Sequence, residues 1–141
     1  MFSRAAEYAI RAMTFLARQP SGKLSGAREI ARAENVPMAF LWKILQNLTR
    51  RRLIRSFKGV HGGYELASPA HRITVGDIVC AMDNGDAAEG CVLGLAECSD
   101  RNPCPLHDTW KDIRGRLTGM MQQTTMADLA EVAAKRLHRS R

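Results

Sequence analysis

The sequence has no apolar run long enough to cross a membrane, because charged residues interrupt each hydrophobic stretch. Arg4, Glu7, Arg11 and Arg18 divide the first helix-like segment, which leaves no room for the apolar core of a signal peptide. The chain also lacks a Gly-rich phosphate loop, a C-x-x-C pair and a nucleophile–base–orienter pattern. These absences predict a cytoplasmic protein that is not an enzyme and has neither a membrane partner nor a small-molecule substrate.

Acidic residues are scarce in the first half of the chain. Through Arg72 there are 13 Lys and Arg against 4 Asp and Glu, whereas the remainder has 8 against 10. The part through Arg72 therefore carries a formal charge of +9 and the remainder −2, which gives +7 for the whole chain of 141 residues. A basic half of this kind predicts contact with a polyanion. By contrast, residues 73–108 contain Arg101 as their only Lys or Arg beside seven acidic residues, so we do not expect this segment to touch phosphate.

Apolar residues at helical spacing predict a mainly α fold that begins with helices over residues 4–18, 27–33 and 37–51. The second and third are joined by a tight turn at Asn35–Val36, which is typical of a helix-turn-helix. The inward face of the third helix is predicted to carry Phe40, Leu41, Ile44, Leu45 and Leu48. Short alternating segments at 53–57 and 64–66 flank a glycine-containing turn and predict a β-hairpin, the wing of a winged helix-turn-helix.

Further along, Thr74 can cap a helix that carries Val75, Ile78, Val79 and Met82. Cys80 lies in this helix, and we expect it to be a small buried hydrophobic residue. From Leu106 the apolar residues follow a four-three spacing that predicts a long dimerisation helix, and Thr124 or Thr125 can cap a final helix. The predicted units are a DNA-binding domain at 1–72, a connecting helix and cysteine-rich loop at 73–105, and the dimerisation and C-terminal helices at 106–141.

Three of the four cysteines lie in one loop with a histidine. Cys91, Cys98, Cys104 and His107 follow the pattern C-x6-C-x5-C-x2-H. In a reducing compartment such a group indicates metal binding rather than disulfides. Thiolates with one imidazole suit an iron-sulfur cluster, and a Cys3His set also suits structural zinc. Structural zinc usually takes two closely spaced ligand pairs, whereas this pattern has only one such pair, Cys104 with His107. A cluster is therefore favoured, and structural zinc or directly reactive cysteines remain the alternative.

Taken together, these segments resemble the IscR/NsrR-type winged-helix regulators, often called the Rrf-two family. The resemblance spans nearly the whole chain. It rests on residues 7–12 (EYAIRA), 28–31 (REIA), 58–66 (KGVHGGYEL) and the cysteine loop. It implies a homodimer that binds a palindromic operator in double-stranded DNA, acts as a repressor and senses redox, nitric oxide or iron-sulfur status through its cluster.

Two features depart from the better-known members of that family. The gap between Cys91 and Cys98 is longer, so the resemblance does not fix whether the cluster would be 2Fe-2S or 4Fe-4S. The fourth ligand is also open. His107 matches one pattern of the family, whereas Glu7 occupies the position of a carboxylate ligand that in other members reaches across from the second subunit. Without such roles, Glu7 would pair with Arg4 or Arg11, and His107 would cap the dimerisation helix.

The resemblance also suggests which residues bind DNA. The start of the recognition helix offers Met38, Ala39, Trp42 and Lys43 to the major groove, and Arg50, Arg51, Arg52 and Arg55 are available to phosphates. In the wing, Lys58 and His61 are candidates, with Lys58 matching a basic residue that relatives insert into the minor groove. Relatives commonly have Glu at position 42, and an indole cannot accept a hydrogen bond from cytosine as Glu does. Trp42 therefore either reads thymine methyls and DNA shape or turns into the core.

Overall fold

The computed structural model describes residues 2–85 and 89–139. Within them lie helices α1 (Arg4–Ala17), α2 (Ala27–Glu34), α3 (Met38–Arg50), α4 (Val75–Asp83), α5 (His107–Gln123) and α6 (Met126–Arg139). Two strands, β1 (Ile54–Phe57) and β2 (Gly63–Leu66), form a hairpin, and a short 3-10 helix spans Ala70–Arg72. The predicted mainly α, winged helix-turn-helix fold is confirmed, and the bounds of α1, α2 and α3 agree with the predicted ranges to within one residue.

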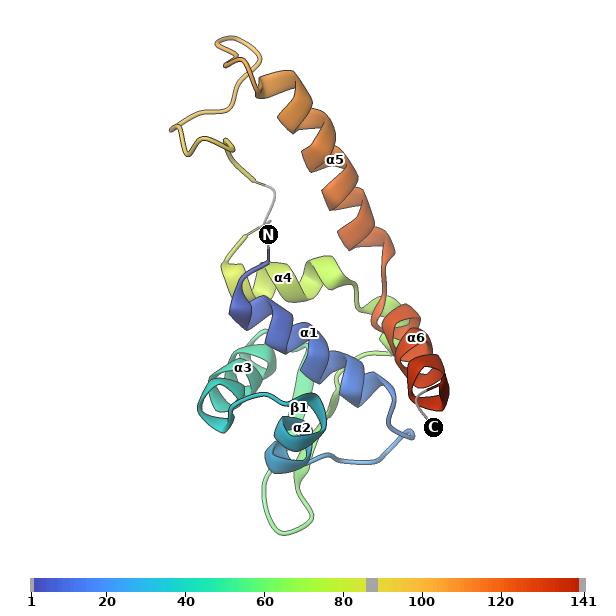
Figure 1. Ribbon diagram of the computed structural model, residues 1–141. Helices are drawn as coiled ribbons and strands as arrows, with labels where there is room; N and C mark the ends of the chain where they lie inside the picture. Colours follow the sequence, from blue (N-terminus) through green and yellow to red (C-terminus); the bar gives the residue numbers. More distant parts are fainter. Residues whose placement is uncertain (1, 86–88, 140–141) are drawn as a thin grey trace.

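Helix α1 lies at the centre of the body. Ala6, Ala9, Ala12 and Met13 are completely buried along one of its faces. The small alanines let other backbones come close, and α1 packs against α2, α3, α4, α6 and β2 (Figure 1). Burial of these side chains and their neighbours supplies the main stabilising free energy of the body.

The hairpin is antiparallel, with Ile54 opposite Leu66 and Phe57 opposite Gly63. Its base is tied to the segment before α2, because Ser25 and Tyr64 exchange two backbone hydrogen bonds of 3.0 and 2.8 Å. Gly63 has a φ of +149°, and a Cβ at this position would lie 2.8 Å from the carbonyl oxygen of Ser25. A side chain there would break this tie, which explains a glycine where the hairpin meets the body.

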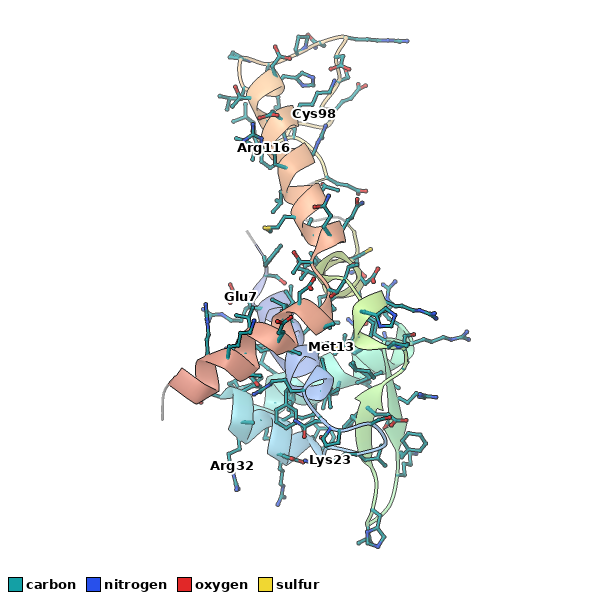
Figure 2. All side chains as sticks on the ribbon, turned by 90° about the vertical axis from the view of Figure 1, so that its right-hand side faces the viewer. Glu7, Met13, Lys23, Arg32, Cys98 and Arg116 are labelled. Atoms are coloured by element: carbon teal, nitrogen blue, oxygen red, sulfur yellow. The ribbon has the colours of Figure 1, made fainter. Side chains whose placement is uncertain are left out.

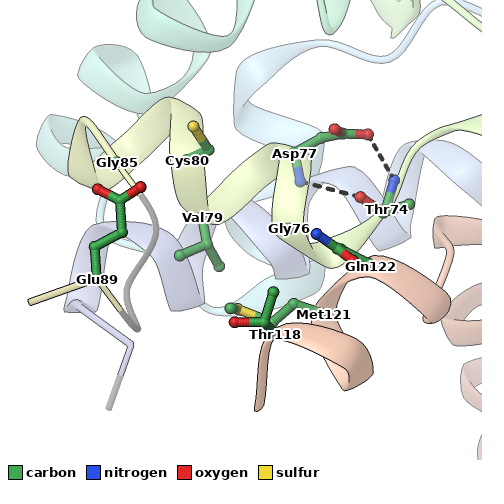
Figure 3. A pocket seen from close by; sticks show the side chains of 10 residues that line it. All are labelled: Thr74, Gly76, Asp77, Val79, Cys80, Gly85, Glu89, Thr118, Met121 and Gln122. Atoms are coloured by element: carbon green, nitrogen blue, oxygen red, sulfur yellow. Dashed lines mark hydrogen bonds between the residues drawn. The ribbon is translucent and has the colours of Figure 1, made fainter. Parts of the chain in front are cut away.

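Helix α4 begins at a capping box. Thr74 Oγ1 accepts a hydrogen bond from the backbone N–H of Asp77, and the Asp77 carboxylate accepts one from the N–H of Thr74 (Figure 3). The predicted role of Thr74 is confirmed. Thr125 and Asp128 make the same reciprocal pair of bonds at the start of α6. Thus Thr125, rather than Thr124, caps the last helix.

Helix α5 extends away from the body as an arm (Figures 1 and 2). Its C-terminal end is fixed by Met121, which is 3% exposed, and α6 then returns to pack on α1, with Met126 completely buried. Residues 90–106, which precede α5, run up to the far end of the arm (Figure 1). We call residues 90–106 the cysteine loop.

Two sequence-based expectations about burial are wrong. Cys80, expected to be buried, is exposed. At 100° per residue it lies on the opposite side of α4 from the buried Ile78, beside a hollow of about 290 Å³ between α4 and α5 (Figure 3). Phe40, expected in the core, is 54% exposed. Its ring packs edge-on against the ring of Tyr8, with 6.0 Å between the two ring centroids. The buried arc of α3 is already filled by Leu41, Ile44, Leu45 and Leu48.

Candidate functional site

The turn between α2 and α3 sets the geometry of the helix-turn-helix. Asn35 ends α2 in a left-handed conformation with a φ of +52°, which an Asn tolerates better than most residues. Val36 then buries its side chain, and Pro37 precedes α3 in an extended conformation. The two helices pack on each other, and Ile30 and Leu41 are completely buried in the core that they share. This leaves one long side of α3 facing solvent.

The solvent-facing side of α3 presents Ala39, Trp42 and Lys43, and Met38 is half-buried. Trp42 is 53% exposed, so the alternative that places its indole in the core does not hold. With Gln46 and Thr49 it lines a groove of about 400 Å³ whose other wall is Ser56 and Tyr64 of the hairpin. The recognition helix and the wing therefore form one continuous surface.

The predicted phosphate-binding arginines differ in their surroundings. Arg50 and Arg52 are exposed at the end of α3. Arg51 donates a hydrogen bond of 3.0 Å to the side-chain oxygen of Asn84 at the end of α4. Arg55 forms a cross-strand ion pair with Glu65 at 3.4 Å. Arg51 and Arg55 would have to exchange these partners for phosphate, whereas Lys58 is exposed in the turn of the hairpin.

The hairpin turn holds one side chain that the sequence analysis did not single out. Val60, between Gly59 and His61, is 97% exposed, and His61 is exposed beside it. Phe57, at the end of β1, is 46% exposed. The signal was present in the sequence, because an apolar residue inside a turn bounded by glycines has no core to enter. An apolar tip next to Lys58 is a shape that suits insertion into a groove.

The cysteine loop is anchored to the arm. The indole N–H of Trp110 donates to the carbonyl of Gly90 at 2.9 Å, and the backbone N–H of His107 donates to the carbonyl of Cys104 at 3.0 Å. Both ends of the loop are therefore fixed to the first turn of α5. The thiols of Cys91, Cys98 and Cys104 are each partly buried.

His107 connects two of the predicted groups. Its side chain is 4% exposed, with Nδ1 3.4 Å from Sγ of Cys98 and Nε2 2.8 Å from Oδ1 of Asp100. The Asp100 carboxylate also binds Nζ of Lys111 at 3.1 and 3.2 Å. These contacts, that with His107 first and that with Lys111 second, hold the pKa of Asp100 below its usual value. Asp100 is a second residue that the sequence analysis did not identify.

The other two cysteines form a second group. Backbone N–H groups of Leu95 and Leu93 donate to the Cys91 sulfur and lower the pKa of its thiol. Burial partly opposes this effect by raising the pKa of Cys91, and a hydrogen bond with the Cys104 side chain lowers that pKa by less than burial raises it. A thiol with a lowered pKa is more readily deprotonated, as a metal ligand or a nucleophile must be.

The four predicted ligands thus occur as two pairs, Cys98 with His107 and Cys91 with Cys104. Within residues 2–85 and 89–139, no three His, Cys, Asp or Glu side chains lie at mutual distances that would hold a metal ion. The donor chemistry nevertheless fits an iron-sulfur cluster, since three thiols of the cysteine loop and the imidazole at the start of α5 belong to one short segment. Glu7 is exposed on α1, in the body, whereas Cys98 lies near the far end of the arm (Figure 2). Within one chain Glu7 does not reach the loop.

Comparison with known proteins decides the family. The sequence profile of Rrf2, described as an iron-dependent transcriptional regulator, matches residues 2–132. The chain belongs to the Rrf2 family. It is 39% identical over 129 residues to Rv1287 of Mycobacterium tuberculosis, a candidate HTH-type transcriptional regulator, covering 91% of this chain and 80% of that protein. It is 29% identical to the HTH-type transcriptional regulator IscR of Cronobacter sakazakii, over 86% of this chain and 75% of the relative.

A solved structure supports the same assignment. CymR, the global cysteine regulator of B. subtilis, superposes with a TM-score of 0.79 at 27% identity, over 94% of this chain and 97% of CymR. These relatives are transcriptional regulators and not enzymes, which confirms the expectation that this Rrf2-family chain is a DNA-binding regulator without catalytic activity. None of the helices in the described residues is long and apolar enough to span a membrane.

Replacing Lys58 by Ala tests the wing. We expect weaker binding to a random-sequence DNA duplex, and a plot of log association constant against log salt concentration whose slope is less steep by about 0.9, because one phosphate contact is lost. The control is Lys135→Ala, which removes another exposed charge, from α6, where Lys135 pairs with Glu131. Identical salt slopes for Lys58→Ala and the unaltered protein would exclude Lys58 from the interface.

Proposed function

We propose that this Rrf2-family chain is a dimeric repressor whose affinity for a palindromic operator depends on an iron-sulfur cluster. Cys91, Cys98, Cys104 and His107 would hold the cluster. The observation that carries the proposal is the placement of three thiols on the cysteine loop beside the buried imidazole of His107, which begins α5 and to whose first turn the loop is fixed. The basic surface of α3 and the hairpin belongs to the body from which that helix extends. One chain therefore carries a ligand set and a DNA-binding surface on separate parts.

The arm supports a symmetric dimer. Leu106, Ile113 and Met120 of the four-three stripe are 46%, 48% and 51% exposed, and Trp110 and Leu117 are partly buried. An apolar stripe of this kind on an extended helix is costly in water and fits the same stripe of a second copy. A two-fold dimer would present two recognition helices, which matches an operator with two inverted half-sites.

The contacts within one chain favour one of the two candidate fourth ligands. His107 is already next to Cys98, whereas Glu7 would have to come from the second copy in the dimer. We therefore propose His107 as the ligand and keep Glu7 of the second copy as the alternative. A histidine among thiolates makes one iron less firmly held and raises its reduction potential relative to an all-cysteine site.

The bound cluster would supply sensitivity to redox state, nitric oxide or iron-sulfur supply. The protein's own residues would link the cysteine loop to the arm. Trp110 and His107 tie the cysteine loop to the first turn of α5, so a change in loop conformation changes the packing at the arm that joins the two subunits. A shift in the arm would alter the spacing of the two recognition helices. A coupling of about 1 to 3 kcal/mol between loop and operator suffices for regulation.

A second candidate is a regulator whose cysteines bind structural zinc or react directly. It is supported by the lowered pKa of Cys91, which increases the thiolate fraction available to an oxidant or electrophile. In this case the DNA-binding part of the proposal would stand and the cluster would not.

The dependence of DNA affinity on the cluster can be measured directly. A duplex selected from a randomised pool by protein loaded anaerobically with iron and sulfide would be titrated, at fixed salt, with loaded and metal-free protein. We expect the two dissociation constants to differ by about 5- to 150-fold. Cys98→Ser should bind like the metal-free protein, whereas Cys80→Ser, a control thiol outside the loop, should retain the difference. Equal affinities of loaded and metal-free protein would refute cluster control.

Substitution of Ile113 by Asp tests the dimer. A charge buried without a partner costs about 3 to 5 kcal/mol, so we expect the dimer dissociation constant, measured by analytical ultracentrifugation, to rise at least about 100-fold. Gly115→Asp introduces the same charge on the opposite side of α5, where an added side chain meets open space, and should leave the dimer intact. Dimers of Ile113→Asp with unchanged affinity would place the interface elsewhere.

A further inference from the structure

The imidazole of His107 is held at both nitrogens. Nε2 lies 2.8 Å from Oδ1 of Asp100, and Nδ1 lies 3.4 Å from Sγ of Cys98. The ring is 4% exposed, so water has little access to compete for either nitrogen. The tautomer of this ring decides which nitrogen can bind a metal, because only the nitrogen without a proton has a free lone pair.

The carboxylate of Asp100 settles which nitrogen that is. An ionised carboxylate only accepts hydrogen bonds, so the proton of the neutral imidazole must lie on Nε2. Nδ1 is then left with its lone pair directed toward Cys98. We propose that Asp100 is a positioning residue that fixes His107 as an Nδ1 ligand beside Cys98. This inference rests on the proposed cluster-binding function and adds to it a residue outside the ligand set.

Lys111 keeps Asp100 in place. Asp100 belongs to the loop and its side chain is 73% exposed, so by itself it would rotate freely. Nζ of Lys111 binds both carboxylate oxygens, at 3.1 and 3.2 Å, and Lys111 lies one helical turn after His107 on α5. Asp100 is thus bridged between two residues of one helix. An exposed ion pair is weak, so the contact with Lys111 contributes little to the stability of the protein. Its effect is to orient the Asp100 carboxylate toward His107.

A carboxylate hydrogen-bonded to a metal-binding histidine is common in metal sites. A carboxylate that accepts from the outer N–H of a ligating histidine orients the ring and increases its basicity, and its loss commonly weakens metal binding about 10- to 100-fold. The contact with Asp100 also favours His107 over Glu7 as the fourth ligand, since it already orients the His107 ring within a single chain. Glu7 would need the second copy.

The first test needs no cluster. The tautomer of His107 would be read from the ¹⁵N NMR shifts of its ring in the metal-free, thiol-reduced protein, at a pH where the ring is neutral, with His107→Asn identifying the signals. We expect the Nε2–H tautomer to dominate. Asp100→Ala should give a mixture, whereas Asp100→Asn should preserve the tautomer because its amide oxygen still accepts. Asp112→Ala removes a carboxylate that pairs with Arg116 on the same helix and should change nothing.

A dominant Nδ1–H tautomer, or a tautomer unaffected by Asp100→Ala, would overturn the inference. The second test follows the rate at which protein loaded with iron and sulfide loses iron to a chelator. Asp100→Ala should lose iron about 10- to 100-fold faster and Asp112→Ala at the unaltered rate. Equal rates for Asp100→Ala and the unaltered protein would also contradict the inference. A chain that takes up no iron would refute the proposed function, while the tautomer would still decide the role of Asp100.

Discussion

The close packing of α1 in the middle of the body is the constraint on which the other elements depend. Its completely buried alanines allow α3, α4 and α6 to approach it together, and β2 of the hairpin also packs against it. The recognition helix is thereby fixed relative to α4, whose last turn is further tied to Arg51 through Asn84. A larger residue at Ala9 or Ala12 would displace several elements at once, because a close-packed interior has no room to absorb it.

A body built in this way leaves two parts outside the core. The hairpin extends from it with an apolar tip and basic neighbours, and the arm extends from α4 with an apolar stripe and the cysteine loop. Both parts expose apolar surface that a monomer in water would not favour. In the proposed assembly a DNA groove covers the hairpin tip and a second copy covers the apolar stripe, which would remove the cost of exposing them.

Local rules made most of the fold predictable. Thr74 was identified because capping uses neighbours in sequence, and the helix-turn-helix because helical spacing is strong in α2 and α3. Burial was less predictable. Cys80 and Phe40 are apolar residues whose exposure depends on which side of a helix the body occupies. Asp100 was missed for a similar reason, since only the fold of the loop brings its carboxylate to His107 and Lys111.

The account depends most on whether the cysteine loop binds an iron-sulfur cluster. The direct measurement is the visible absorption, together with the iron, sulfide and zinc content, of protein purified without oxygen, alongside a Cys98→Ala variant. The account predicts a brown protein with equimolar iron and sulfide, and loss of the colour in the variant. A colourless protein with one zinc ion per chain would contradict it and leave the loop as a structural zinc site on a DNA-binding regulator.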